Sequence, residues 1–529
     1  MSGLEDELHG SGRTRSPWMA ARAYESRPLE GSLDADVCVI GAGFGGLTAA
    51  YALASAGRSV VVLEDGAVAG GESARSTAHL SAALGALYVK LEALHGEPAA
   101  RIIAESHMAA VDFIERVSRE HSIDCGFRRL DGYLVWPSDA DLSELEAELA
   151  ACDRAGVAVE KVQRAPAGTW DTGPCLRFTG QGQIDPVRYL SGLARAAARA
   201  GARIFTRSHA RILPGEPVRV RTEGGVVAAR HVVLATNAPI DDRVAISARQ
   251  AAYRTYAIAA ELPRGVVPEP VLVWDTVEPY HYVRLAAPPP GHKPLLVVGG
   301  EDHKVAHAAD ADERWERLEA WARARFPAMG AVTHRWSGQV QESADGIGYI
   351  GRHPGEAQPV YVITGDSGNG TTNGTLGGLL VADLILGRPN DWAKVYDPGR
   401  LPRGAAELAR ENLDAAAQYL RYAEPGDAQS VDQIPPGCGA ILKRGLAPVA
   451  VYRAPDGALI ERSGVCPHLG GPLCWNQGEG TWDCPVHGSR FSPEGEVLTG
   501  PANDPLGPPE TLLGRIPILR RWDQPPRAP

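Results

Sequence analysis

The first apolar runs of the chain predict a strand, a tight turn, a helix and a second strand. Residues 36–40 form a short apolar run that ends at a glycine-rich stretch, 41–46. Residues 47–56 are alanine-rich and helical in pattern, and a glycine at 57 ends them. Residues 59–63 are again continuously apolar. We therefore expect a β-turn-α-β unit of the usual length of about 30 residues.

The rest of the chain alternates between helical and strand-like patterns. The helices that we expect cover residues 98–120, 142–155, 184–200, 310–324, 376–386 and 405–423. The isolated strands that we expect cover residues 133–136, 157–159, 203–205, 218–221, 231–235 and 360–363. Residues 251–300 alternate and contain turn prolines, which predicts an antiparallel sheet outside the nucleotide-binding unit.

Composition and charge exclude several classes of protein. The chain has 529 residues, of which 44% are hydrophobic and 22% charged, so we expect several ordinary globular domains. The net charge of −11 argues against nucleic-acid binding, and the chain lacks the run of about 18 apolar residues that a membrane span needs. Residues 1–24 lack the apolar core of a secretory signal, and the eight cysteines are too sparse for a disulfide framework. We therefore expect a cytoplasmic protein.

The glycine-rich stretch has the spacing of a dinucleotide-binding loop. Gly41, Gly43 and Gly46 stand in G-x-G-x-x-G register between the predicted strand and helix. The first permits a tight turn, the second lets the backbone approach a pyrophosphate, and the third lets helix and strand pack closely. Glu64 follows the second strand, where a carboxylate can accept ribose hydroxyls. FAD and NAD both use such a loop, so the loop alone leaves the choice between them open.

Two short Cys/His pairs near the C-terminus predict a metal centre. Cys466-Pro-His468 and Cys484-Pro-Val-His487 are separated by 15 residues, so two loops can enclose one compact centre. A Cys₂His₂ zinc site is one interpretation of these four donors. An iron–sulfur cluster is the other.

The residues around these pairs resemble the Rieske iron–sulfur domain. The matching stretches are 466–471, 481–491 and 500–502. The resemblance favours iron over zinc. It implies that Cys466 and Cys484 bind one iron of a [2Fe–2S] cluster and that His468 and His487 bind the other.

The chain departs from the high-potential members of that family at three positions. Gly471 and Val486 stand where those domains carry a bridging cysteine pair, and Phe491 stands where they carry a tyrosine. Ser489 is expected to hydrogen-bond a cluster sulfur. Because fewer donors to the sulfurs lower the potential, we expect the lower part of the range of about −150 to +300 mV. We expect Cys474 to be a buried small apolar residue.

Several stretches between residues 34 and 400 resemble the FAD-dependent oxidoreductases of the D-amino-acid-oxidase, glycine-oxidase and sarcosine-oxidase type. They are 36–64, 70–79, 185–190, 235–237 and 361–386. The resemblance implies FAD rather than NAD. The cluster favours the same choice, because a flavin takes two electrons from a substrate and can release them singly. The residues that the resemblance places at FAD are Gly41, Gly43, Phe44, Gly45, Gly46, Glu64, Arg75, Ser76, Thr77, Gly365 and Gly370.

Together, the resemblances predict the fold class and the domain order. We expect an α/β protein, a Rossmann-like FAD-binding fold with an inserted α+β substrate domain, followed by a small all-β Rieske domain. The predicted parts are a polar, poorly ordered leader (1–33), the oxidoreductase (34–400), a helix and linker (401–427) and the Rieske domain (428–529). Within the oxidoreductase, 34–90, 185–240 and 341–400 are assigned to FAD binding, and 91–184 and 241–340 to the substrate. Bacterial FAD oxidoreductases with a C-terminal Rieske domain resemble this combination.

Candidates for substrate chemistry are less specific. Arg284 has the planar, bidentate chemistry of a carboxylate clamp, and Tyr282 shares its strand face. His79 ends the segment expected beside the flavin and can hydrogen-bond the ring or the substrate. The alternatives are a surface ion pair for Arg284 and a structural role for His79.

His303 and His307, four residues apart, could share a helix face and hold a mononuclear iron with a carboxylate. We disfavour this site, because the oxygenases that use it carry the Rieske domain first, whereas this chain carries it last. We expect Asp302 to be a helix N-cap instead.

The leading hypothesis is an FAD enzyme that oxidises an amine or amino-acid-like C–N bond by hydride transfer and passes electrons singly to the Rieske cluster. Its expected partners are a small-molecule substrate and an external protein that accepts or donates electrons. One alternative is a reductase in which an external carrier reduces the cluster and the flavin reduces a substrate. Another is a redox carrier or sensor without turnover.

Overall fold

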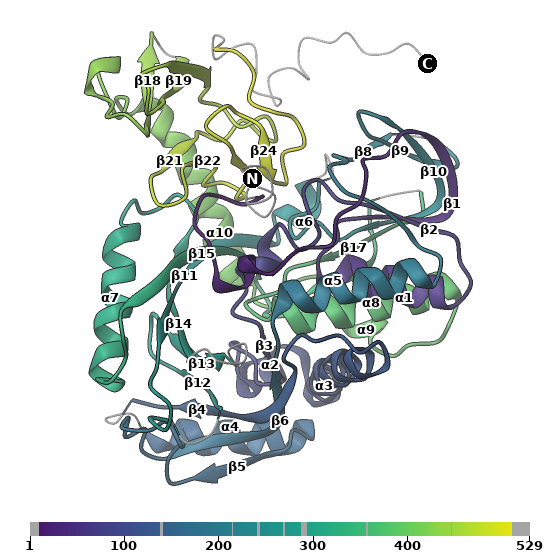
Figure 1. The fold of residues 1–529 in the computed structure, drawn as a ribbon, viewed down its shortest axis with the longest axis vertical. Helices are drawn as coiled ribbons and strands as arrows, with labels where there is room; N and C mark the ends of the chain where they lie inside the picture. Colours follow the sequence, from purple (N-terminus) through teal and green to yellow (C-terminus); the bar gives the residue numbers. More distant parts are fainter. Residues whose placement is uncertain are drawn as a thin grey trace.

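The computed structural model describes residues 10–137, 141–213, 215–240, 244–267, 270–286, 294–355, 358–445 and 447–509. Figure 1 shows a sheet flanked by helices on the right, a second sheet on the left, and a smaller body of strands at the top. The second sheet is formed largely by segments that the chain inserts between strands of the first. This arrangement confirms the predicted fold class.

The first sheet contains the glycine-rich loop and is mostly parallel. Its order is β16 (Tyr349–Arg352), β17 (Val360–Thr364), β10 (Gly225–Leu234), β1 (Gly31–Ile40), β2 (Val60–Leu63) and β7 (Arg203–Phe205), with β9 (Val218–Arg221) on β10 and β8 (Arg211–Leu213) on β9. β1 pairs in parallel with both β10 and β2. The end of β1 and all of β2 are buried apolar runs, as expected for strands covered on both faces.

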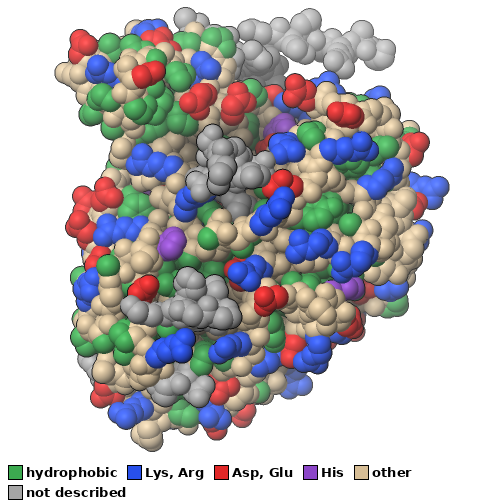
Figure 2. All heavy atoms as spheres, in the orientation of Figure 1, with side chains coloured by type: hydrophobic (Ala, Val, Ile, Leu, Met, Phe, Trp, Pro, Cys, Tyr) green, Lys and Arg blue, Asp and Glu red, His purple; other side chains and the backbone are tan. Residues whose placement is uncertain are grey.

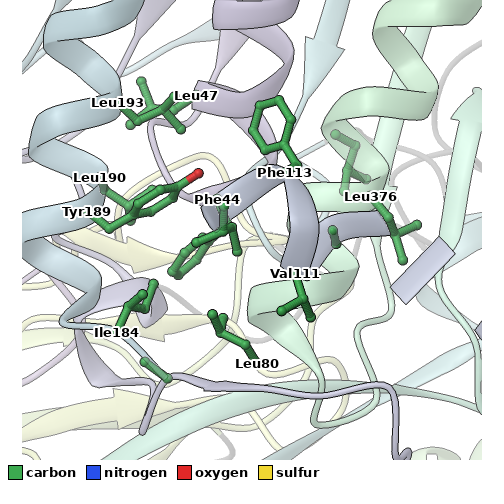
Figure 3. Close-up of a cluster of buried hydrophobic side chains, with 14 of the residues drawn as sticks. Phe44, Leu47, Leu80, Val111, Phe113, Ile184, Tyr189, Leu190, Leu193 and Leu376 are labelled. Atoms are coloured by element: carbon green, nitrogen blue, oxygen red, sulfur yellow. The ribbon is translucent and has the colours of Figure 1, made fainter. Parts of the chain in front are cut away.

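Helices pack against one another beside the turn that follows β1. α1 (Phe44–Ser55) contacts α5 (Pro186–Arg199) and α8 (Gly370–Leu386), and α3 (Glu97–Glu120) contacts α8. Figure 3 shows Phe44 of α1, Tyr189 of α5 and Leu376 of α8 in a single buried cluster. The rings of Phe44 and Tyr189 stack with centroids 6.0 Å apart. This packing anchors the start of α1 and therefore the loop that precedes it.

The helix predicted at residues 376–386 begins earlier, at Gly370. Glycine has a low intrinsic helix propensity, which is why the sequence pattern placed residues 365–370 in a turn and began the helix after them. In the fold these glycines permit close contact between helices, since a Cβ at Gly374 would lie 3.1 Å from the backbone nitrogen of Gly45 in α1. Tertiary packing overrides propensity at this position.

The second sheet carries the predicted substrate part. Its order is β15 (Val332–Ser343), β11 (Gln250–Glu261), β14 (Leu295–Lys304), β13 (His281–Ala286), β12 (Leu272–Asp275), β4 (Arg128–Val135), β6 (Cys175–Gln183) and β3 (His79–Leu80), with β5 (Val159–Val162) on β6. Strands β11 to β14 confirm the antiparallel sheet predicted from alternation. α7 (Ala311–Arg325) covers β11 and β14, and α4 (Leu142–Ala155) packs on β5, β6 and α2 (Tyr88–His95). α6 (Val244–Ser247) and α9 (Ala393–Tyr396) are short helices.

The C-terminal domain consists of small antiparallel sheets. One contains β18 (Cys438–Arg444), β19 (Ala447–Arg453) and β20 (Leu459–Ser463), and another contains β21 (Cys474–Asn476), β22 (Thr481–Asp483), β23 (Arg490–Phe491) and β24 (Val497–Thr499). α10 (Ala405–Ala417) leads into this domain and tightens into the 3₁₀ turn η3 (Gln418–Ala423), followed by η4 (Val431–Gln433). The helix expected at 405–423 is thus α-helical only as far as residue 417.

The expectation of a poorly ordered leader is wrong for residues 10–33. The 3₁₀ turn η1 (Pro17–Ala20) buries Trp18, whose Nε1 donates to the Ser76 carbonyl at 2.9 Å. Ser16 Oγ donates to the Ala74 carbonyl at 2.6 Å. The segment lies where the C-terminal domain meets the oxidoreductase part (Figure 1), so its polar groups are hydrogen-bonded within an interface instead of being solvated.

Buried ion pairs join the C-terminal domain to the oxidoreductase part. Arg75 contacts Glu479 at 3.1 Å, and both side chains are at most 1% exposed. Arg254 contacts Asp483 at 3.4 Å, and Arg490 contacts the same carboxylate at 3.3 Å. Burial alone would raise the pKa of Glu479, but the three arginines outweigh it and hold the pKa at about 2. Charges that are out of contact with water therefore fix how the two parts dock.

Figure 2 shows one face of the molecule, on which acidic and basic side chains are interspersed. The C-terminal domain forms the upper lobe of this view and projects from the larger body. Within the described part of the chain, no helix is both long enough and apolar enough to cross a bilayer.

Candidate flavin and iron–sulfur sites

The glycine-rich loop lines a cavity of about 220 Å³ at the carboxyl ends of β1 and β2. Gly41 has a φ of +102°, a conformation that favours glycine, and a Cβ at Gly46 would lie 1.9 Å from the Gly41 carbonyl oxygen. α1 begins at Phe44 without a side-chain cap, so the backbone N–H groups of its first turn remain available. Gly43, Phe44 and Gly45 line the cavity. This cradle fits a pyrophosphate.

Glu64 lies directly after β2 and lines the same cavity. Its carboxylate accepts hydrogen bonds from the backbone N–H groups of Ala42 and Gly66, at 2.5 and 3.3 Å. Burial raises the pKa of Glu64 to about 7. A ribose hydroxyl that donates to this carboxylate would compensate for its lost hydration, so the position fits the predicted role.

The predicted late turn forms another wall of this cavity. Gly370 at the start of α8 lines it, as does Ser76, whose hydroxyl lies 3.4 Å from that of Thr371. Gly365 is not among the lining residues. Its φ of +74° instead allows the chain to turn before α8.

The structure contradicts the prediction that Arg75 binds FAD. Its guanidinium donates to the carbonyls of Gly12, Thr14 and Ser337 at 2.6 to 2.9 Å and pairs with Glu479. These partners come from the N-terminal segment, from β15 and from the C-terminal domain. The sequence pattern gave no indication that these three segments meet at Arg75.

Residues of the C-terminal domain close the cofactor cavity. Its lining includes Val497, Leu498, Thr499, Gly500, Ala502 and Asn503. Arg211 donates to the Asn503 carbonyl at 2.9 Å, and Asn503 Nδ2 donates to the Ala210 carbonyl at 3.3 Å. Arg211 also pairs with Asp504. This wall was not predicted, because nothing in the sequence of residues 497–503 marks a nucleotide contact.

Loosening this wall is expected to weaken FAD retention. Arg211→Ala removes a hydrogen bond of about 0.5–1.5 kcal/mol, so we expect FAD release to accelerate roughly 2–10-fold. The rise of flavin fluorescence after dilution of the holoenzyme measures this rate. Arg230→Ala removes a 76% exposed arginine from β10 of the same sheet and should leave the rate unchanged. Equal release rates in wild type and Arg211→Ala would show that the wall does not retain FAD.

A second cavity, of about 180 Å³, shares Ser76, Asp366 and Thr371 with the first. His79 and Tyr282 both line it, so the structure brings together two of the three predicted catalytic residues. Their rings meet edge to face with centroids 5.5 Å apart.

Two aromatic residues of this cavity, Trp274 and Tyr280, were not predicted from the sequence. Tyr280 lies two residues before Tyr282, and period-two spacing could have placed both on one face. For Trp274, which comes from the neighbouring strand β12, the sequence carries no comparable signal.

His79 is neutral in this environment. Its Nδ1 lies 3.1 Å from the hydroxyl of Thr77, and its Nε2 lies 3.3 Å from the Val283 carbonyl. Burial, assisted by the charge of Arg284, lowers the pKa of His79 to about 3. Thr77 thus lies in the substrate cavity, where it orients His79.

The structure contradicts the interpretation of Arg284 as a carboxylate clamp. Arg284 is 2% exposed and is absent from the cavity lining. Its guanidinium donates to the carbonyls of Thr77, Ala78 and Ile184 and lies over the Trp18 ring at 4.6 Å. A surface ion pair is equally excluded, because Arg284 instead ties three backbone segments together.

The two Cys/His pairs lie on adjacent hairpin loops. The Cys466 N–H donates to the Gly471 carbonyl at 2.8 Å, and the Cys484 N–H donates to the Ser489 carbonyl at 2.8 Å. Both cysteines are at most 2% exposed, and each thiol shifts the pKa of the other. The rings of His468 and His487 lie next to one another, with centroids 5.2 Å apart.

These four donors fit a two-iron cluster. Nδ1 of His487 is buried and has no hydrogen-bond partner among the described residues, as expected for a nitrogen that binds a metal. Over the same residues, no three His, Cys, Asp or Glu side chains form a group that could hold a single ion. The two cysteine sulfurs form one pair of donors and the two histidine nitrogens form another. Each pair suits one iron of a cluster, and this separation disfavours a tetrahedral zinc site.

The surroundings of the loops match most of the expectations. A Cβ at Gly471 would lie 2.7 Å from Val486, so the two expected bridging positions are indeed adjacent. The Ser489 side chain helps to lower the pKa of the Cys466 thiol, and its hydroxyl accepts a hydrogen bond from the Ala502 N–H at 3.0 Å. Cys474 differs from its prediction: it is half-buried and accepts a hydrogen bond from the Arg421 guanidinium, which the 3₁₀ turn η3 brings to it.

The structure also contradicts the helical interpretation of residues 302–307. Asp302 and His303 belong to strand β14, and Asp302 accepts a hydrogen bond from Tyr280 rather than capping a helix. The ring nitrogens of His303 contact the Tyr256 hydroxyl and the Lys304 carbonyl. Strand geometry therefore removes the shared helix face that a metal site with His307 requires.

One side chain connects the substrate cavity to the cluster loop. Gln339 of β15 lines the cavity, and its Nε2 donates to the Gly488 carbonyl at 2.9 Å. Gly488 directly follows His487. A Cβ at Gly488 would lie 2.3 Å from the Cβ of Ala252, so the glycine lets the cluster loop press against the second sheet.

A dinucleotide cradle beside an aromatic cavity, joined to paired Cys/His loops, defines a flavoprotein fused to an iron–sulfur domain. Residues 36–384 match the FAD dependent oxidoreductase family, and residues 426–516 match the Rieske [2Fe-2S] domain. The chain belongs to the FAD-dependent oxidoreductase family and carries a C-terminal Rieske domain. It is an oxidoreductase that binds FAD and a [2Fe–2S] cluster.

The relatives agree with this assignment. The chain is 29% identical to YhfW of Bacillus subtilis, named as a Rieske 2Fe-2S iron-sulfur protein, over 92% of this chain and 96% of that protein. It is 30% identical to the gamma-glutamylputrescine oxidoreductase of Escherichia coli, over 70% of this chain and 89% of that enzyme. Glycine oxidase from Geobacillus kaustophilus shares the fold, with a TM-score of 0.57 at 20% identity over 70% of this chain and 99% of that one.

Proposed function

We propose that this enzyme oxidises an amine or amino-acid-like C–N bond and passes the electrons one at a time to its own Rieske cluster. The contact between Gln339 and Gly488 carries the proposal, because it joins the substrate cavity to the cluster loop through one side chain. The E. coli relative named as a gamma-glutamylputrescine oxidoreductase supports C–N chemistry.

Each cofactor has its own set of residues in this proposal. Cys466 and Cys484 bind one iron, and His468 and His487 bind the other. The N-terminus of α1 holds the pyrophosphate, and Glu64 holds the ribose. When bound, FAD supplies hydride acceptance, and the cluster supplies single-electron acceptance.

The substrate cavity itself positions the reacting C–N bond. Tyr282 and the neutral imidazole of His79 face the substrate and orient it by contact and hydrogen bonding. The wall formed by residues 497–503 covers the dinucleotide and excludes water from it.

Electrons leave the cluster toward an external acceptor protein. Both histidines are partly exposed, whereas both cysteines are buried, so the nitrogen side of the cluster is the accessible one. His487 faces the second sheet, where it lines a small cavity with Ala252, and this leaves His468 for the external protein. We place the enzyme in the cytoplasm, where its eight cysteines, all free of disulfides, stay reduced.

Anaerobic titration of the holoenzyme with a panel of amines and amino acids tests the proposal. A substrate should bleach the flavin and then produce the electron paramagnetic resonance signal of a reduced Rieske cluster. A flavin that bleaches while the cluster stays oxidised would contradict internal transfer. If an external reductant reduces the cluster first and the flavin afterwards, and no amine bleaches the flavin, the electrons run in the opposite direction.

A further inference from the structure

The substrate cavity offers no cation to a substrate carboxylate. Among the described residues that line it, the charged ones are Glu72, Arg75 and Asp366. The guanidinium of Arg75 is held by backbone carbonyls and Glu479. A carboxylate bound in this cavity would therefore be buried without a counter-charge, which is strongly unfavourable.

Arg284, a neighbouring arginine, is also unavailable to bind a substrate carboxylate. Within the described part of the chain, its guanidinium donates to the carbonyls of Thr77, Ala78 and Ile184. Moving it toward the cavity would leave these carbonyls unpaired in the protein interior.

The cavity does offer groups that attract a cation. Trp274, Tyr280 and Tyr282 line it, with the two tyrosine rings 5.8 Å apart at an angle of 32°. Aromatic faces bind ammonium groups through the ring quadrupole, and each contact contributes about 0.5–2 kcal/mol.

The two tyrosines are held in place by a buried network behind them. Tyr280 donates to Asp302 at 3.0 Å, and the hydroxyls of Tyr282 and Thr255 are 3.0 Å apart. Thr255 also helps to lower the pKa of Asp302. Asp302 thus positions the Tyr280 ring and Thr255 the Tyr282 ring, and the other oxygen of Asp302, Oδ1, is buried without a hydrogen-bond partner among the described residues.

A second acceptor lacks a partner at the cavity. Gln339 is 2% exposed, and its Nε2 is committed to the Gly488 carbonyl. Its Oε1 consequently has no donor among the described residues. An N–H or O–H donor of a ligand that reached this oxygen would satisfy it.

We propose that the substrate is an amine held through its ammonium group, and that the site does not recognise an α-carboxylate. The inference rests on the proposed function and names its substrate class. The bound ammonium group first releases one proton to water. The α-carbon of the neutral amine then loses a hydride to FAD, which gives an iminium ion. Water hydrolyses the iminium ion to a carbonyl compound and releases ammonium or the smaller protonated amine.

The charge state of the cavity supports a cationic ligand. Burial, together with the nearby charge of Glu72, raises the pKa of Asp366 to about 7. Burial raises the pKa of Asp302 to about 6. An ammonium group in the cavity would lie beside Asp366, which lines it, and would favour the ionised form of that carboxyl.

Binding of two ligands of opposite charge to the oxidised holoenzyme tests the inference. tert-Butylammonium and pivalate share a tert-butyl group and carry opposite charges, and tert-butylammonium has no α-hydrogen to lose. We expect tert-butylammonium to perturb the flavin absorption with a Kd at least about tenfold below that of pivalate, a difference of about 1.4 kcal/mol. Equal affinities, tighter pivalate binding, or no response to either ligand would overturn the inference.

Oxidation of matched pairs separates this inference from the proposed function. We expect 1,4-diaminobutane and benzylamine to reduce the flavin at least about tenfold more efficiently than ornithine and phenylglycine, their α-carboxylated counterparts. Better reduction by the amino acids would overturn the inference and leave C–N oxidation intact. If tert-butylammonium binds but no amine reduces the flavin, the cation site stands and the proposed function fails.

A variant pair connects the effect to the cavity. Asp366→Asn should weaken tert-butylammonium binding about tenfold without weakening pivalate binding. Asp124→Asn changes a carboxylate that is 94% exposed on the surface and should change neither affinity. If Asp366→Asn left both affinities unchanged, the cavity would not be the ammonium site.

Discussion

Replacing Cys466 with alanine is expected to abolish the [2Fe–2S] cluster while leaving a flavin that substrate can still bleach. The thiolate pair of Cys466 and Cys484 is buried, and no further cysteine lies on these two loops, so a lost sulfur cannot be replaced. Electron delivery to a one-electron acceptor should fall by at least about 100-fold. Iron and acid-labile sulfide per chain, the Rieske resonance and anaerobic flavin bleaching measure the three parts of this result.

Cys438→Ala is the matched control, because Cys438 lies in the same domain at the start of β18 and outside both loops. It should retain full iron and sulfide content. Retention of the Rieske resonance in Cys466→Ala would contradict the ligand assignment, and zinc in the wild-type protein would contradict the cluster itself.

Glu479→Gln is expected to weaken the docking of the Rieske domain more than the substitution of an exposed charged residue does. The substitution leaves Arg75 buried without its carboxylate partner, and breaking a buried pair in this way costs about 3–5 kcal/mol. Chemical denaturation followed by cluster absorbance should show the loss as an earlier transition. Because the interface also closes the cofactor cavity, FAD should be released earlier as well.

The same carboxylate predicts how stability depends on pH. The pKa of Glu479 is about 2 in the folded protein, below its ordinary value of 4.5. A lowered pKa gives stability that is complete above about pH 4.5 and is lost as the pH falls toward 2. Wild-type protein should therefore lose stability between these pH values, and Glu479→Gln should show a smaller change over that range.

Glu97→Gln is the control for both measurements. Glu97 pairs with Arg101 on α3, where the two side chains are 43% and 61% exposed. An exposed pair contributes about 0–1 kcal/mol, so little change is expected. A similar small effect for Glu479→Gln would show that the buried pair does not hold the domains together.

Motifs whose geometry is local were predictable from the chain. Gly41 is needed because its φ is positive, and Gly46 is needed because a Cβ there would collide with the Gly41 carbonyl. Both constraints lie within one turn. The two Cys/His loops are likewise short hairpins that fold on themselves. The βαβ unit, the substrate sheet and the four cluster donors could therefore be predicted.

Residues whose role depends on distant partners were not predictable. Arg75 and Arg284 both carry the chemistry of a ligand clamp, and both are bound instead to backbone carbonyls of other segments. Asp302 lies beside two histidines in the sequence, but its place in a strand turns it toward Tyr280. Residue type alone does not specify which partner a long side chain reaches.

The sequence by itself determined the cofactor classes, because glycine spacing and paired Cys/His donors are properties of short loops. Only the tertiary structure decided which distant segments lie between and around the cofactor sites. The wall of residues 497–503 over the flavin cavity and the contact of Gln339 with Gly488 each join segments more than 140 residues apart. Such contacts arise from the docking of whole domains, which no local pattern encodes.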